Sequence, residues 1–273
     1  MTGTAPNSQP TSASKALIED FAEGLRQRDI WWTFAVEDMQ QRYRRSALGL
    51  AWVLIGFGAF VGGVTVFFAG LTQRDPLHYA LHVGLGFAAF SFLVSALVEG
   101  CQVFTSAQGW IKSVPLPLSI YVYKCVVRLG LIFLLQSVCL LPLLFMSGQG
   151  LGPQIILLIP VLLLFGVNAI CAQYLLGMIC ARLRDLTHLV QATTRLLLFV
   201  TPILWVRGDM DGTRGLIADL NPVAHYVEVF RAPILGEPIR DLSWMVVLGG
   251  TALLCTLTLL IGARLRRQLV FWV

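Results

Sequence analysis

The chain has 273 residues, of which 56% are hydrophobic and only 13% are charged. A soluble domain carries roughly 25% charged residues, which it needs to cover its surface. The composition therefore excludes a soluble enzyme, a disordered chain and a nucleic-acid-binding domain, and it indicates a membrane protein whose apolar surface faces lipid. The net charge of +5 is typical of basic residues that flank membrane spans on the cytoplasmic side.

The first 47 residues precede any apolar stretch that is long enough to span a membrane. Residues 1–14 are rich in Thr, Ser, Ala, Pro and Asn, and we expect them to form a disordered tail. They lack the basic and apolar regions of a signal peptide, so the N-terminus is expected to stay in the cytoplasm. Residues 15–47 are predicted to be a cytoplasmic segment.

Helical spacing over Asp29–Ser46 separates an apolar face from a charged face. The apolar face carries Trp32, Val36, Met39, Tyr43 and Ala47, and the charged face carries Glu37, Asp38, Gln41, Arg44 and Arg45. The pattern predicts an amphipathic helix that lies in the plane of the cytoplasmic membrane interface. Two interpretations stay open, a simple anchor and a gate beside a cytoplasmic portal.

Six apolar stretches follow within residues 48–263, each long enough to cross about 30 Å of hydrocarbon. They run over about Leu48–Leu71, Tyr79–Gly100, Tyr121–Met146, Gln154–Ala181, His188–Val206 and Trp244–Ala263. These are continuous apolar runs without the alternation of a β-barrel, so the sequence predicts an all-α membrane protein with six transmembrane helices after an interfacial helix. The fifth stretch is the weakest, because it contains Arg195.

Basic residues predict the orientation of these spans. With the N-terminus inside, thirteen of the 20 Lys and Arg residues flank spans on the cytoplasmic side and five lie outside. The excess predicts that both termini lie in the cytoplasm, including a basic tail over residues 264–273.

Two connections differ from simple loops. The cytoplasmic segment 101–120 has a polar centre around Trp110 and Ile111 and ends in Pro115 and Pro117, which predicts a short helix stopped by prolines. Such a helix can dock into a groove on a soluble partner, although an ordinary connecting loop is the alternative. The outer loop 207–242 is broken repeatedly by Gly and Pro, which predicts re-entrant or surface helices that cap a pore from outside.

Charged residues inside spans are functional candidates by default. Arg128 and Arg195 can each contact a phosphate group, or they can pair with Glu99 or extend to the interface. The six cysteines have no zinc-site spacing and are interpreted as packed apolar side chains. The sequence contains no P-loop and no catalytic motif, and it shows no internal repeat of the kind that ion-coupled carriers have. A transporter with this sequence would therefore need a partner as its source of energy.

Several stretches, in this order, resemble the permease subunits of polysaccharide ABC exporters, the type-2 ABC group that exports O-antigen, capsule and teichoic acid. The resemblance covers about Asp29 to the C-terminus. It rests on Arg42–Trp52, Trp110–Pro117, Arg182–Leu186, Thr201–Trp205, Asn221–Pro222 and Val227–Pro233.

The resemblance implies a multi-pass protein of the bacterial inner membrane that is not itself an enzyme. Its implied partners are a second copy of the chain, two nucleotide-binding subunits that hold ATP and magnesium, and a glycan on a lipid carrier, often undecaprenyl diphosphate. No nucleic acid is implied. The alternatives are a type-2 exporter of a drug or lipid without a glycan, and a membrane assembly protein with no transport role.

The resemblance also assigns roles to individual residues. Coupling to the ATPase falls on Trp110, Ile111, Lys112, Pro115 and Pro117. A gate for the lipid diphosphate falls on Arg42, Tyr43, Arg44 and Arg45. Independently of the resemblance, aromatic rings can pack on sugar faces, so candidate pore aromatics are Phe57, Phe60, Phe67, Phe68 and Tyr79, with packing in lipid or in the core as the alternative. The outer-loop candidates are Asn221, Pro222, Tyr226 and Arg231.

Overall fold

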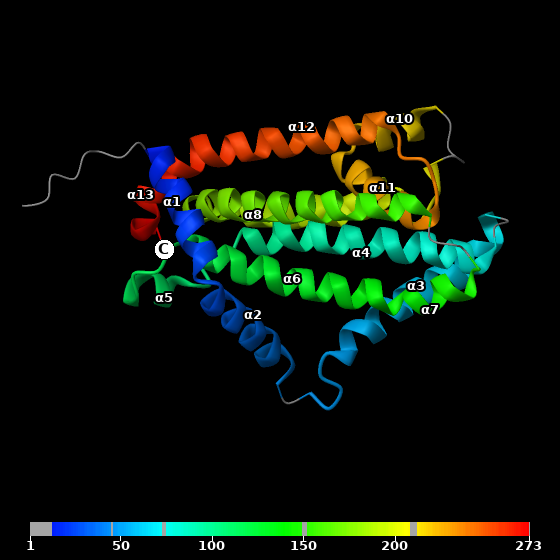
Figure 1. Cartoon of the computed structure of the whole chain (residues 1–273), viewed down its shortest axis with the longest axis horizontal. Helices are drawn as coiled ribbons and strands as arrows, with labels where there is room; N and C mark the ends of the chain where they lie inside the picture. Colours follow the sequence, from blue (N-terminus) through cyan, green and yellow to red (C-terminus); the bar gives the residue numbers. More distant parts are fainter. Residues whose placement is uncertain (1–12, 45, 73–74, 149–151, 208–211, 273) are drawn as a thin grey trace, which may run out of the picture.

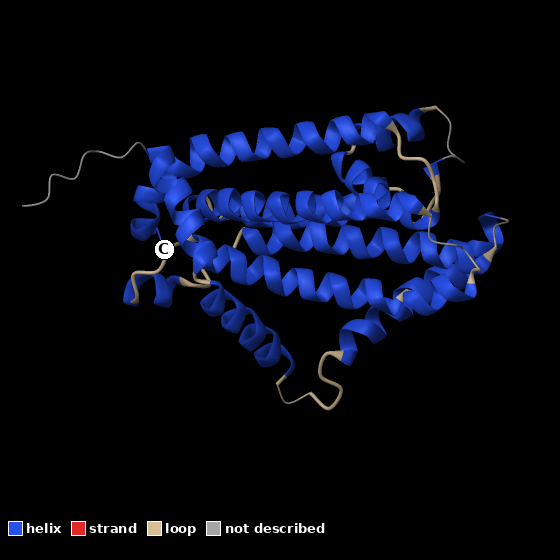
Figure 2. Cartoon of the chain, in the orientation of Figure 1, coloured by secondary structure: helices blue, strands red, loops and turns tan. Residues whose placement is uncertain are grey.

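The computed structural model describes residues 13–44, 46–72, 75–148, 152–207 and 212–272. Over these ranges the chain consists of helices and connecting loops, with no strand (Figure 2). The helices α4, α6, α8 and α12 lie side by side along the long axis of the molecule (Figure 1). The long helices are α3 (Ala51–Thr72), α4 (Pro76–Gly100), α6 (Ser119–Cys139), α8 (Leu158–Arg182) and α12 (Asp241–Leu257). The prediction of an all-α membrane protein is therefore confirmed.

Five helical segments of the described chain are long and apolar enough to cross a membrane. They match the first four predicted spans and the sixth. The fifth predicted span corresponds to α9 (Asp185–Val200), which has only 16 residues. A helix of that length rises about 24 Å, less than the roughly 30 Å of a hydrocarbon core. The count of six spans therefore stays a prediction.

Helix α4 lies at the centre of the molecule, and fourteen of its 25 residues are therefore buried. It packs against α3, α6, α8 and α11 (Pro222–Leu235). Aromatic rings from four of these helices meet in the core, with centroids 5.4 Å apart for Phe92 and Phe133 and 6.0 Å apart for Phe165 and Phe230. The outer-loop helix α11 is thus part of the same core as the long helices.

Short helices gather at the two ends of the bundle (Figure 1). The end that we call the N-terminal end carries α1 (Ala13–Arg26), α2 (Arg28–Tyr43), α5 (Gln108–Ser113) and α13 (Ala263–Trp272). A single π-helical turn, Thr258–Gly262, connects α12 to α13. The opposite end carries α7 (Leu141–Met146), the 3₁₀ helix Pro153–Leu157, α10 (Thr213–Leu220) and α11. The predicted coupling segment and the predicted outer loop therefore lie at opposite ends of the helix bundle.

The structure also shows where three of the predicted helices lie. The helix expected over Asp29–Ser46 is α2, and it packs against α6 through the fully buried Ala35. The short helix before the prolines is α5, and the helix expected in the outer loop is α11. Helix α1 is an addition that sequence patterning missed, and the predicted tail 1–14 lies outside the described residues up to position 12.

Glycine sets how closely α8 approaches the turn that follows α4. A Cβ atom at Gly177 would lie 2.6 Å from Val103 Cγ1 and 2.8 Å from Phe104 Cδ2, both on buried side chains. At Gly166, on the same helix, a Cβ atom would meet nothing within 4 Å.

We expect Gly177→Ala to lower the thermal midpoint of the purified protein in detergent, because the added methyl group forces Val103 and Phe104 to move. Such overpacking lowers the free energy of unfolding by about 1–3 kcal/mol. Gly166→Ala is the matched control. It should leave the midpoint unchanged or raise it, because alanine favours helix over glycine by about 1 kcal/mol. Equal midpoints for the two variants would contradict the packing described here.

Candidate functional site

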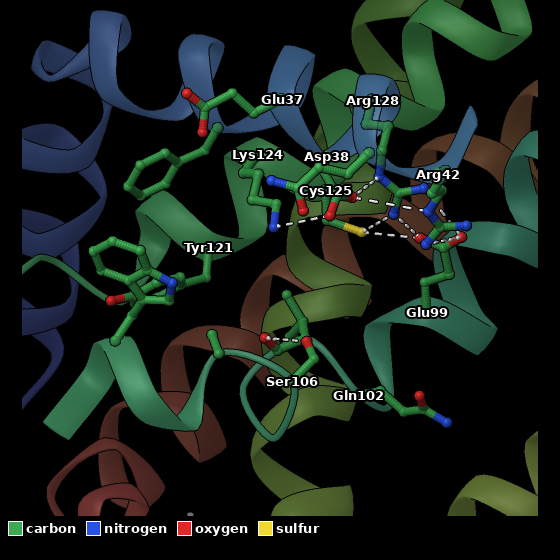
Figure 3. Close-up of a pocket in the computed structure, with 15 residues that line it drawn as sticks. Glu37, Asp38, Arg42, Glu99, Gln102, Ser106, Tyr121, Lys124, Cys125 and Arg128 are labelled. Atoms are coloured by element: carbon green, nitrogen blue, oxygen red, sulfur yellow. Dashed lines mark hydrogen bonds and ion pairs between the residues drawn. The ribbon is translucent and has the colours of Figure 1, made fainter. Parts of the chain in front are cut away.

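A pocket of about 330 Å³ opens at the N-terminal end, where α2 faces the end of α4, the coupling segment and α6 (Figure 3). Its walls carry charged and polar side chains together with the ring of Trp110. The lining includes Glu37, Asp38, Gln41, Arg42, Glu99, Gln102, Trp110, Tyr121, Lys124 and Arg128. The pocket therefore brings the predicted gate helix and the predicted coupling segment to one place.

The guanidinium of Arg128 is the most buried charge in this pocket. Its side chain is 4% exposed, and its Nε lies 2.7 Å from Asp38 Oδ2 on α2. A second ion pair joins it to Glu99 near the end of α4. A buried cation is tolerated only when carboxylates neutralise it, and the planar guanidinium can serve two of them at once. Arg128 thus ties α2 and α4 to α6.

Two more cations share the same carboxylates. Lys124 Nζ lies 3.3 Å from Asp38 Oδ1, and Arg42 Nη2 lies 3.6 Å from Glu99 Oε1. Arg42 Nε also lies 3.9 Å from Oδ2 of Asp38, which is one helical turn before it on α2. We call this set of five residues the ion-pair cluster: Asp38, Arg42, Glu99, Lys124 and Arg128.

Three cations and two carboxylates give the ion-pair cluster a net formal charge of +1. The two outer cations are the accessible ones, since half of the Arg42 side chain and about a third of that of Lys124 are exposed. An anion that entered the pocket would meet these two first. It would have to compete with Asp38 and Glu99, because each cation is already paired.

The structure divides the predicted gate residues. Arg42 belongs to the ion-pair cluster, Tyr43 is half-buried, and Arg44 is exposed just after α2. Arg45 lies outside the described residues. Asp38, which the helical pattern places on the charged face, turns toward α6 and pairs with Arg128. The helical pattern did not predict that this part of the charged face packs on the bundle, because the pattern contains no information about α6.

The two predicted intramembrane charges differ. For Arg128 the pairing with Glu99 is observed, as one of the two sequence interpretations expected. Arg195 lies exposed on α9, and it belongs to neither the pocket nor the ion-pair cluster. Lys124 was missed as a site residue, although its four-residue spacing from Arg128 places both on one face of α6.

The coupling residues lie where a soluble partner can reach them. Trp110 is 54% exposed, and its ring lies 5.5 Å from that of Phe34 on α2. Lys112 and Pro115 are also exposed, whereas Ile111 is half-buried against the core and Pro117 is buried. The segment therefore presents one side outward and anchors the other in the bundle. Its role in coupling stays a prediction.

The candidate pore aromatics fall into two groups. Phe57 and Phe60 pack inside the chain against Phe87, and Tyr79 is fully buried and donates its hydroxyl to the Leu204 carbonyl at 2.6 Å. Phe67 and Phe68 are exposed on α3. In this structure only the second group has an open face, and the pore role of all five stays a prediction.

The outer-loop candidates hold the opposite end together. Asn221 accepts the Val223 N–H at 3.0 Å, which caps α11 ahead of Pro222, and donates to Thr201 at 2.9 Å. Tyr226 donates to Asn168 Oδ1 on α8 at 2.9 Å. The buried Arg231 donates to the Pro202 carbonyl at 2.9 Å and lies 3.0 Å from His82 Nε2 on α4.

An ion-pair network that the sequence did not predict closes the same loop. Asp219 pairs with both Arg207 and Arg240, and Arg240 also pairs with Glu228. Burial raises the pKa of the Asp219 and Glu228 carboxyls, but hydrogen bonds and charge from these arginines outweigh it and lower both values. The network therefore favours the ionised carboxylates.

We expect Arg128→Gln to lower the thermal midpoint in detergent strongly, because Asp38 and Glu99 lose the cation that neutralises them. The loss in the free energy of unfolding should be about 3 kcal/mol or more. Lys124→Gln is the matched control on the same helix face. It should cost less than about 1 kcal/mol, since that pair is partly exposed. A loss for Lys124→Gln as large as for Arg128→Gln would show that the buried guanidinium is not what holds α2.

A pH prediction follows from the outer network. Carboxylates with a lowered folded pKa contribute stability above their unfolded values of about 4, and this contribution is lost as the pH falls further. The thermal midpoint should therefore drop between about pH 5 and pH 3. In Arg240→Gln the drop should be smaller, because both carboxylates have lost this partner. Parallel pH profiles would contradict the assignment.

Comparison with known proteins identifies the class of this chain. Residues 30–235, about three quarters of its length, match the family described as ABC-2 type transporter. Over 242 residues the chain is 21% identical to the O-antigen export system permease protein RfbA of Myxococcus xanthus. The aligned region covers 86% of this chain and 92% of that relative. The matched family range contains α2, the ion-pair cluster and α11. The expected resemblance is thereby confirmed, and the chain belongs to the ABC-2 type transporter family of membrane proteins.

Proposed function

We propose that this chain is the transmembrane subunit of an ATP-driven exporter that moves a lipid-linked polysaccharide, of the O-antigen or capsule type, across a bacterial inner membrane. The observation that carries the proposal is the pocket at the N-terminal end, in which an ion-pair cluster joins the gate helix α2 to the bundle beside the exposed coupling segment. The relative's name, an O-antigen export permease, supports the glycan.

The exposed side of the coupling segment fits a soluble ATPase subunit. Trp110, Lys112 and Pro115 project at one end of the bundle, where a groove on a partner can receive them. In this proposal the partner holds ATP and magnesium, and its closure on ATP pushes this segment. The excess of basic residues that flank the spans supports a cytoplasmic location for this end, together with both termini.

A second copy of the chain would complete the transport path. On α3, Gly58 and Gly62 are four residues apart, and a Cβ atom at either would meet nothing within 4 Å. Small residues at this spacing let two membrane helices approach closely. Helix α9 is also largely exposed, and with the turn after it this helix would form the fifth of six crossings in each copy of a homodimer.

The ion-pair cluster gives the gate a mechanism. An undecaprenyl diphosphate headgroup offers more negative charge than one carboxylate, so it competes with Asp38 and Glu99 for the accessible cations Arg42 and Lys124. When these pairs exchange, α2 loses its ion pair with Glu99 near the end of α4 and keeps its packing on α6, which includes the pair of Asp38 with Arg128. Headgroup binding therefore loosens α2 from α4, and the push on the coupling segment completes the opening.

An exporter of an apolar drug or lipid is a second candidate, and one observation favours it. A pocket of about 500 Å³ between α4, α6 and α8 is lined almost entirely by apolar side chains, with Gly130 and Gly166 leaving room in its walls. This pocket has no charged lining that would recognise a diphosphate.

Copurification tests the proposal directly. The chain, tagged in its native host, should retain an ATPase subunit in mild detergent, and deletion of its gene should remove the host polysaccharide from the cell surface while lipid-linked glycan accumulates inside. Surface glycan that persists after deletion would refute the proposal that a polysaccharide is the exported substrate. Accumulation of an apolar compound in its place would favour the second candidate.

Charge neutralisation on α2 tests the gate. Arg42→Gln should lower surface glycan about tenfold at normal protein level, because a charge-assisted contact with a phosphate is worth about 1.5–3 kcal/mol. Arg44→Gln is the matched control, since Arg44 is exposed and lies outside the pocket. It should lower export less than about twofold, on the scale of an exposed charge. Equal export by both variants would sink the assigned role of Arg42.

A further inference from the structure

A buried carboxylate joins three distant parts of the chain at the N-terminal end. Asp20, near the middle of α1, has a side chain that is 0% exposed. Its Oδ1 accepts the Leu118 N–H and its Oδ2 accepts the Ser119 N–H, both at 3.0 Å. These two residues follow the last proline of the coupling segment directly. Asp20 therefore holds the point where the coupling segment passes into α6.

Helix α6 depends on this remote carboxylate. Its own N-cap residue, Leu118, makes no side-chain capping bond, so the free N–H groups at its start need another acceptor. A carboxylate at a helix N-terminus also gains from the helix dipole. The Ser119 hydroxyl returns a bond to the Asp20 carbonyl at 2.7 Å, and Tyr123 one turn later donates to the Phe21 carbonyl at 3.0 Å.

The C-terminal helix closes this contact from the other side. Arg266 on α13 donates to Asp20 Oδ1 at 2.9 Å and to the Ala16 carbonyl at 2.7 Å. In Figure 1, α1 runs between α13 and the start of α6. Close packing fixes the geometry, because a Cβ atom at Gly24 would overlap the Ser119 hydroxyl. Each of the two carboxylate oxygens of Asp20 thus accepts at least one hydrogen bond, and these contacts restrict the movement of α1 along its axis.

Helix α1 is also the support of the gate helix. It ends at Arg26 and α2 begins at Arg28, so one residue, Gln27, forms the joint between them. The Gln27 N–H still bonds to the Glu23 carbonyl at 3.2 Å, and the Ile30 N–H bonds to the Gln27 carbonyl at 3.1 Å. A displacement of α1 is therefore passed to α2 across a short, hydrogen-bonded connection.

We propose that Asp20 is a positioning residue for energy coupling: it fastens the end of the coupling segment to α1, so that ATP-driven displacement of that segment moves α2. This inference rests on the proposed function, because it needs an ATPase that acts on the coupling segment. It adds a second route to the gate, which runs through α1 and not through the pocket. Arg266 keeps the carboxylate in place from α13.

The test compares export with ATP hydrolysis in the same complex. Asp20→Asn keeps the size of the side chain and loses its charge, so it weakens two backbone contacts and the pair with Arg266. We expect ATP hydrolysis by the copurified complex to stay within about twofold of the wild type while surface glycan falls about tenfold, the scale of one charge-assisted bond. The ratio of glycan exported to ATP hydrolysed should therefore fall about tenfold.

Glu19→Gln is the matched control, because it removes a charge from an exposed neighbour on the same helix. It should leave the ratio unchanged. A normal ratio in Asp20→Asn, whether both activities persist or fall together, would overturn the inference. If Asp20→Asn does not reach the membrane at normal level, Ser119→Ala decides, since it removes only the bond to the Asp20 carbonyl and should lower the ratio about threefold.

Failure of the proposed function would look different. A wild-type complex that hydrolyses ATP but supports no surface glycan would refute the export proposal itself, before any variant is compared. A wild-type complex that exports normally, together with an unchanged ratio in both Asp20→Asn and Ser119→Ala, would leave the exporter intact and remove Asp20 from its coupling route.

Discussion

A guanidinium that is almost entirely removed from water must be neutralised by contact, and this requirement organises the N-terminal end of the molecule. Arg128 comes from α6, but the carboxylates that neutralise it come from α2 and from the end of α4. The charge therefore cannot be buried unless three separate helices meet. Ala35 is the one fully buried residue of α2, so this buried ion pair is a major part of what holds α2 against the bundle.

The two ends of the bundle solve the same problem with different chemistry. At the opposite end the buried Arg231 is held by a backbone carbonyl and by the ring of His82. At the N-terminal end the partners of Arg128 are carboxylates that two accessible cations also share. Ion pairs that share carboxylates occur at the opposite end as well, between Asp219, Arg207, Arg240 and Glu228. The ion-pair cluster differs in that it lines a pocket beside the coupling segment, where Arg42 and Lys124 are accessible to an anion.

Much of this fold follows from the sequence, because long apolar runs and proline breaks determine helices locally. They predicted five of the long helices, α5, α11 and the helical nature of α2. The partners of Arg128 were predicted only in part: Glu99 was expected, but Asp38 was assigned only to the charged face of its helix, because a helical wheel does not contain the neighbour on which α2 packs. Asp20 gave no local signal, since its contacts are about 100 and 246 residues away in the chain.

The distance between α2 and the end of α4 during the ATPase cycle tests the central claim most directly. Spin labels at Gln41 on α2 and at Gln102 in the turn after α4, two exposed residues that line the pocket, report this distance by pulsed electron resonance. In the complex with its ATPase, the account predicts one short distance with ADP and a second one, longer by about 5 Å, when hydrolysis is trapped, on the scale of known one-turn helix shifts. A single, unchanged distance in both states of an exporting complex would contradict it.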